Sequence, residues 1–166
     1  MPISRAAEPG SVPALGPCLG GWTLVKLAVA LLVVAVLAAI AVPAYNGWRE
    51  RARVTQAISD ITGIESSIGL YEYEYGSPPA RLDSAVNPIP LDPWGNPYQY
   101  LLIQGAPPKA KGQVRKDKNL VPINTDYDLY SMGPDGLSVP PLTAAASQDD
   151  IVRANDGGFV GRASDY

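Results

Sequence analysis

The sequence contains no histidine, and its single cysteine, Cys18, lies close to the N-terminus. Without histidine, the chain lacks the side chain that most often serves as a general acid or base and as a metal ligand. A lone cysteine excludes a disulfide within the chain. We also find no phosphate-cradling glycine loop and no serine-nucleophile motif. Together these absences argue against an enzyme.

Charge is also sparse. The chain has 13 Lys and Arg residues against 16 Asp and Glu residues, a formal net charge of −3. A protein that binds nucleic acid without a special motif normally relies on a strong positive charge. We therefore predict no nucleic-acid partner.

The most informative feature present is an uncharged, largely apolar stretch at residues 27–48. At about 1.5 Å per residue a helix of this length covers roughly 33 Å, close to the hydrocarbon thickness of a bilayer. A secretory signal has a shorter apolar region that precedes a cleavage site with small residues. Here the pair Gly20-Gly21 comes before the apolar stretch. Cleavage at this pair would keep the helix in the mature protein.

The start of this stretch resembles the prepilin-like family, which comprises type IV pilins and the pseudopilins of type II secretion. The family pattern is a glycine, an aromatic residue, Thr-Leu-aliphatic-Glu-Leu, and a proline about twenty residues on. This chain matches it with Gly21-Trp22-Thr23-Leu24-Val25-Lys26-Leu27 and Pro43. Lys26 is the one departure, because it stands at the acidic position.

The resemblance implies that a prepilin peptidase cleaves after Gly21 and methylates the new N-terminus at Trp22. The mature helices would then bundle into a filament. In the family the acidic residue is thought to balance a neighbour's terminal amine, because an unpaired charge is costly in an apolar environment. With Lys26 at this position, another subunit supplies the carboxylate, or the protein assembles differently, or it does not assemble on its own.

A stripe of apolar residues continues beyond the predicted span at spacings of three and four. This spacing predicts an amphipathic helix over residues 49–76, and its apolar face packs on a small domain in preference to forming a coiled coil. We expect the helix to end near Tyr75-Gly76, before Pro78-Pro79. The stripe consists of Val54, Ala57, Ile58, Ile61, Ile64, Ile68 and Tyr71.

Residues 77–166 are rich in Pro, Gly and Tyr, which is typical of loops and short strands. A turn is predicted to lead into a strand ending near Ile103. The turn resembles a hallmark of the major pseudopilins, Asp92-Pro93-Trp94-Gly95-Asn96-Pro97-Tyr98. We favour a structural role, in which Trp94 and Tyr98 anchor the sheet to the helix, over a catalytic role for Asp92.

A strand starting at Asp126 is predicted to end in the turn at Gly133-Pro134-Asp135-Gly136. This segment resembles the calcium-binding loop of pseudopilins, which ends at an Asp-Ile pair. The resemblance implies calcium ligands at Ser131, Asp135, Asp149 and Asp150, although residues 137–146 replace the expected glycine-rich link. The alternative is that Asp135-Gly136 caps a turn and that Asp149-Asp150 starts a short helix at residues 151–154.

A basic run in a Gly/Pro-containing loop comprises Lys109, Lys111, Arg115, Lys116 and Lys118. We predict a solvated hairpin loop in preference to a patch for an anionic partner. These charges could also pair with acidic residues of a neighbouring filament subunit, for which Asp149, Asp150 and Asp156 are candidates. The tail at residues 155–161 is expected to be a loop whose Phe159 packs back onto the domain.

The expected fold is α+β and pilin-like, with a long N-terminal helix packed against a small antiparallel sheet. Its parts are a cleaved leader (1–21), a transmembrane helix (22–48), its amphipathic continuation (49–76) and a small β/loop domain (77–166). The resemblance implies a single-pass protein of the bacterial inner membrane with a periplasmic C-terminal domain. The positive-inside rule alone would favour the opposite orientation, because Arg49, Arg51 and Arg53 follow the span.

The implied function is that of a pseudopilus subunit that drives protein export across the outer membrane by type II secretion. Its implied partners are further copies of itself, minor pseudopilins, the inner-membrane assembly platform and the prepilin peptidase. The alternatives are a type IV pilin or minor pilin, and a signal-anchored binding protein that does not assemble.

Overall fold

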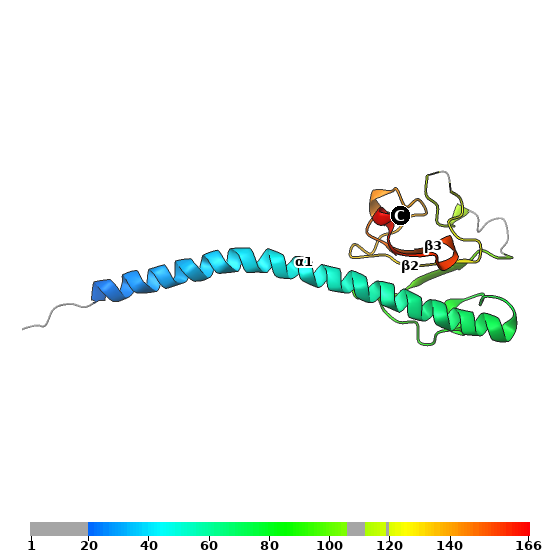
Figure 1. Cartoon of the computed structure of the whole chain (residues 1–166), viewed down its shortest axis with the longest axis horizontal. Coiled ribbons are helices and arrows are strands. Elements are labelled where there is room, and N and C mark those ends of the chain that lie inside the picture. The colour runs from blue at the N-terminus through cyan, green and yellow to red at the C-terminus, as the bar shows by residue number, and fades with distance from the viewer. Residues whose placement is uncertain (1–19, 106–111, 119) are drawn as a thin grey trace, which may run out of the picture. The chain divides into compact units, whose positions relative to one another are not determined.

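The computed structural model describes residues 20–105, 112–118 and 120–166. Cys18 and nearly all of the predicted leader lie outside these residues. The chain forms two compact units, Met1–Tyr45 and Asn46–Tyr166, and helix α1 (Gly20–Tyr75) contributes residues to both (Figure 1). The predicted helix end is confirmed. Gly76 adopts φ +79° and donates its N–H to the carbonyl of Glu72 at 2.7 Å, which is the role of the glycine that follows a helix.

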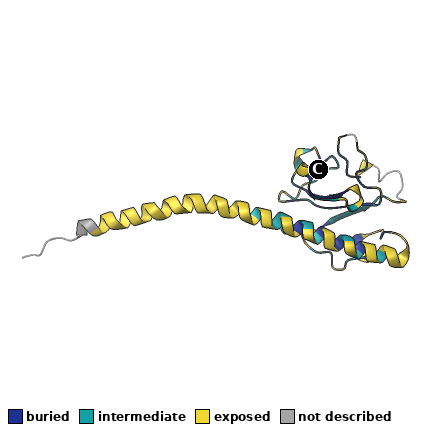
Figure 2. Cartoon of the chain, viewed as in Figure 1, coloured by how far each residue is buried: buried dark blue, intermediate teal, exposed yellow. Residues whose placement is uncertain are grey.

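The part of α1 in the first unit is apolar and exposed. Every side chain from Thr23 to Tyr45 is exposed, as Figure 2 shows in yellow. The most apolar window of the helix has a mean hydropathy of 2.9, and none of it is buried within the chain. The described residues therefore contain one helix that is long and apolar enough to cross a membrane.

The second unit contains a four-stranded antiparallel sheet in the order β1-β2-β3-β4. The strands are β1 (Gln99–Leu102), β2 (Tyr127–Ser131), β3 (Ile151–Ala154) and β4 (Phe159–Arg162). A short 3₁₀ turn at Leu82–Ser84 precedes β1, and further 3₁₀ turns lie between or after the later strands at Ala145–Ser147, Asn155–Gly157 and Ala163–Asp165. The arrangement of one long helix and a small antiparallel sheet confirms the predicted α+β, pilin-like class.

Apolar side chains pack on both faces of the sheet. On one face, Ala57, Ile61, Ile64 and Ile68 of α1 are buried against a cluster that includes Leu129 and Ile151. This confirms the stripe predicted from the spacing of apolar residues. A second cluster covers the other face and consists of Ile123, Leu142, Val152, Ala154 and Ala163.

Two local predictions for the end of the chain are wrong. Residues 151–154 form β3, which pairs with β4 along its full length, and not a helix. Phe159 begins β4 where a loop was expected, although its ring does pack back onto the domain, 5.1 Å from the ring of Tyr166. All four residues of β3 are buried, so the strand has no alternation of apolar and polar residues that would reveal it.

Candidate functional site

The apolar half of α1 is the first candidate site. Its aliphatic residues remain half to two-thirds exposed, with Leu32 at 66% and Ile40 at 67%. Burying such a side chain fully stabilises by about 1.5–3 kcal/mol, so a row of them has a strong tendency to enter lipid or to pack on neighbouring helices. Pro43 lies inside the helix, at its predicted position in the family pattern. Gly21 and Trp22, the predicted processing site, lie in the first turn of α1.

The second candidate site is the place where the two family-like motifs meet. Asp92 is buried and accepts the N–H groups of Trp94 at 3.0 Å and Asn96 at 2.8 Å through Oδ1. Its Oδ2 accepts the hydroxyl of Ser131 at 2.5 Å. The amide of Asn96 reaches the carbonyl of Gly133 at 3.5 Å. The carboxylate of Asp92 therefore stabilises the turn at residues 92–96 and connects it to the end of β2.

Two aromatic residues of the same motif attach this turn to α1. The hydroxyl of Tyr98 donates to Oδ2 of Asp60 at 2.9 Å, and its ring belongs to the core on the helix side of the sheet. The indole N–H of Trp94 lies 3.4 Å from Oε2 of Glu50. Gly95 adopts φ +101°, a conformation that favours glycine at this turn. The motif thus joins helix, turn and sheet.

The turn after β2 leaves no room for a side chain at Gly133. We expect Gly133→Ala to lower the free energy of unfolding by about 2–4 kcal/mol, because its φ is +64° and a Cβ would lie 2.6 Å from the carbonyl oxygen of Asp149. Urea unfolding followed by circular dichroism measures this loss. Gly136→Ala is the matched control, since it shares the positive φ but its nearest neighbour lies 3.5 Å away. Equal losses in the two variants would contradict the steric argument.

Two of the four predicted calcium ligands, Ser131 and Asp135, are engaged in other hydrogen bonds. The hydroxyl of Ser131 is donated to Asp92, and Oδ1 of Asp135 accepts the N–H of Leu137 at 2.8 Å. Asp135 and Asp149 do line one open pocket of about 410 Å³. Asp150 pairs with Arg115 instead. Calcium prefers six to eight oxygen ligands, and the described part of the chain contains no group of three or more acidic residues placed to hold a metal ion. Oδ1 of Asp149 and Oδ1 of Asp150 are buried without a hydrogen-bond partner among the described residues, and calcium binding stays a prediction.

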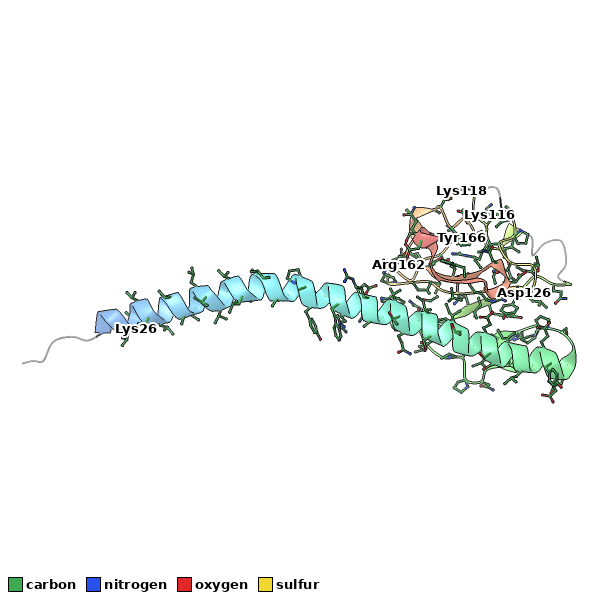
Figure 3. The ribbon with its side chains drawn as sticks, viewed as in Figure 1. Lys26, Lys116, Lys118, Asp126, Arg162 and Tyr166 are labelled. Carbon is green, nitrogen blue, oxygen red and sulfur yellow. The ribbon has the colours of Figure 1, made fainter. Side chains whose placement is uncertain are left out.

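The prediction of a solvated basic loop is wrong for Arg115. Its side chain is only 3% exposed and forms an ion pair with Asp150, which is fully buried. Burial raises the pKa of Asp150 to about 6, while the hydroxyl of Ser138 and the charge of Arg115 limit the rise. Lys116 and Lys118 lie on the side of the domain away from α1 (Figure 3). Lys109 and Lys111 lie outside the described residues.

Arg153 is a second buried cation that sequence reasoning missed. It donates to Asp126 at 2.7 and 2.8 Å and to Glu65 of α1 at 2.8 Å, and its guanidinium lies 4.2 Å from the centre of the Tyr127 ring. Burial opposes its charge, but the hydrogen bonds to Asp126 and Glu65 raise the pKa of Arg153 overall. The signal available in the sequence was an arginine inside the apolar run at residues 151–154.

An exposed apolar helix, a continuation with one buried face and a small antiparallel sheet define the class of pilin-like proteins with an N-terminal hydrophobic helix. No family model and no solved structure matches the chain. Among curated proteins, it is 32% identical over 137 residues to the type II secretion system core protein G of Pseudomonas aeruginosa, covering 70% of this chain and 84% of that protein.

Two further relatives carry the same name. The protein of Aeromonas hydrophila is 30% identical over 152 residues, which cover 79% of this chain and 89% of the relative. The protein of Escherichia coli K12 is 29% identical over 137 residues, which cover 70% of this chain and 82% of the relative. The chain therefore belongs to the family of type II secretion system core protein G.

Proposed function

We propose that this protein is the major pseudopilin of a type II secretion system. In this role it is a structural subunit that assembles into a pseudopilus and drives protein export across the outer membrane. The observation that carries the proposal is the similarity to core protein G, which extends over 84% of the Pseudomonas aeruginosa protein. We expect no catalytic activity.

The exposed apolar half of α1 supports both a membrane-bound and an assembled state. Before assembly it would lie in the inner membrane as a single span, with the sheet domain in the periplasm. In the filament the same residues would pack on the helices of neighbouring subunits. Minor pseudopilins, the inner-membrane assembly platform and the prepilin peptidase would be the further partners, as the resemblance implies.

The first experiment determines the N-terminal residue and the intact mass of the protein extracted from its native membrane. We expect a chain that starts at methylated Trp22. Gly21→Val should retain residues 1–21, because the peptidase would lack the glycine that precedes the cut, and secretion of the organism's extracellular proteins should be lost. Gly20→Val is the matched control and should still be processed. A wild-type chain that starts at Met1 would contradict the filament proposal and favour an anchored binding protein.

A type IV pilin is the second candidate, favoured by Lys26 at the family's acidic position. The two functions differ in what the cell loses when the protein is deleted. If the protein is a pseudopilin, its deletion should abolish the release of secreted proteins into the culture medium and leave surface pili intact. Loss of pili with normal secretion would favour the second candidate.

A further inference from the structure

Arg115 connects its own loop to two places in the segment between β2 and β3, residues 138–139 and Asp150. It lies within residues 112–118, in the connection between β1 and β2. One guanidinium nitrogen donates to the hydroxyl of Ser138 at 2.5 Å and to the carbonyl of Val139 at 2.7 Å, and the other donates to Asp150. The segment between β2 and β3 is thus held at its middle and at its end by one cation.

The groups around Arg115 are those that would surround a metal cation. They comprise a buried carboxylate, a hydroxyl and a backbone carbonyl, the oxygen types that calcium prefers. Ser138 also donates its hydroxyl to Oδ2 of Asp150 at 2.6 Å, so these oxygens form one connected set. The ring of Tyr130 lies 4.3 Å from the guanidinium carbon and covers its face.

Arg115 is itself fixed from the other side. Its backbone N–H donates to Oδ2 of Asp128 at 2.7 Å, and its carbonyl accepts the N–H of Ile123 at 3.1 Å. Oδ1 of Asp128 accepts the amide of Asn124 at 2.9 Å. The planar guanidinium is therefore presented to its oxygens in a set orientation, which suits arginine better than lysine.

We propose that the guanidinium of Arg115 takes the place of a divalent cation in closing the segment between β2 and β3, so that the fold of this protein does not require calcium. A second cation beside Asp150 would be repelled by Arg115, which already pairs with Oδ2 of this carboxylate, while Oδ1 is buried without a hydrogen-bond partner among the described residues. The inference concerns the stability of the domain and holds whether or not the protein forms a pseudopilus.

The direct test compares the melting temperature of the full chain in detergent micelles with calcium chloride and with a calcium chelator, followed by near-ultraviolet circular dichroism. We expect the two melting temperatures to agree within about 1 °C, because an ion that does not bind the native state shifts nothing. Calcium that raises the melting temperature by about 5 °C or more would overturn the proposal.

A substitution tests whether Arg115 stabilises the segment between β2 and β3. Arg115→Met should melt about 10 °C or more below the wild type in both solutions, because it leaves the buried carboxylate of Asp150 without its cationic partner. Arg81→Met is the matched control, since the pair of Arg81 with Asp83 is exposed, with the arginine side chain at 79%, and it should melt within about 2 °C of the wild type.

Equal melting temperatures for Arg115→Met and Arg81→Met would overturn the proposal. If Arg115→Met does not fold, Arg115→Lys provides the second measurement. Lysine keeps the charge but loses the fork that reaches Ser138, Val139 and Asp150 together, so a fall of about 5 °C is expected. A lysine variant that matches the wild type would contradict the assigned geometry.

Discussion

Arg153→Met is expected to lower the free energy of unfolding by about 3–5 kcal/mol, because it leaves two carboxylates near the core without their partner. Arg153 joins β3 to Glu65 of α1 and to Asp126, and its side chain is 3% exposed. Both ion pairs and the contact with the Tyr127 ring are lost together. Urea unfolding of the full chain in micelles, followed by circular dichroism, measures the loss.

Arg162→Met provides the matched control on the neighbouring strand. Arg162 lies on β4, its side chain is 34% exposed, and its nearest carboxylate oxygen, on Glu50, is 3.7 Å away. A partly exposed pair at this distance, with no hydrogen bond between its members, is expected to contribute only about 0–1 kcal/mol. Losses of the same size for Arg153→Met and Arg162→Met would contradict the conclusion that the buried pair fastens the sheet to the helix.

The helix and the first two strands could be predicted because their signals are local. The apolar stretch at residues 27–48 and the spacing of Ala57, Ile61, Ile64 and Ile68 depend only on neighbours within one or two turns. The β1 and β2 strands follow recognisable turns or carry alternating aromatic residues. β3 was missed because α1 and the second apolar cluster cover its two faces, which removes the alternation of a half-exposed strand.

The contacts that the predicted calcium ligands make with distant residues could not be predicted from the motif. The motif containing Ser131, Asp135, Asp149 and Asp150 predicts a common calcium ion, but it does not show which other groups of the chain contact these side chains. Arg115 reaches Asp150 from 35 residues away, and Asp92 reaches Ser131 from 39 residues away. Contacts at such separations follow from the folded domain and leave no periodic signal in the sequence.

Asp92→Ala is expected to lower the free energy of unfolding by about 3–5 kcal/mol. The change removes the acceptor for the N–H groups of Trp94 and Asn96 and for the hydroxyl of Ser131, and a hydrogen bond to a charged group contributes about 1.5–3 kcal/mol. Urea unfolding measures the total. Amide hydrogen exchange resolves its origin, because Trp94 and Asn96 should exchange faster while β3 keeps its protection.

Asp92→Asn separates the shape of the side chain from its charge. The amide oxygen can still accept the two N–H groups, and Ser131 can turn its hydroxyl to accept from the new amide, so we expect a loss of only about 1 kcal/mol. The hydroxyl of Ser131 also accepts the N–H of Gly133 at 3.1 Å, which links Asp92 to the turn after β2. If Asp92→Ala were as stable as Asp92→Asn, the carboxylate would not be the group that holds the two turns together, and the attachment would rest on Tyr98 and Trp94 alone.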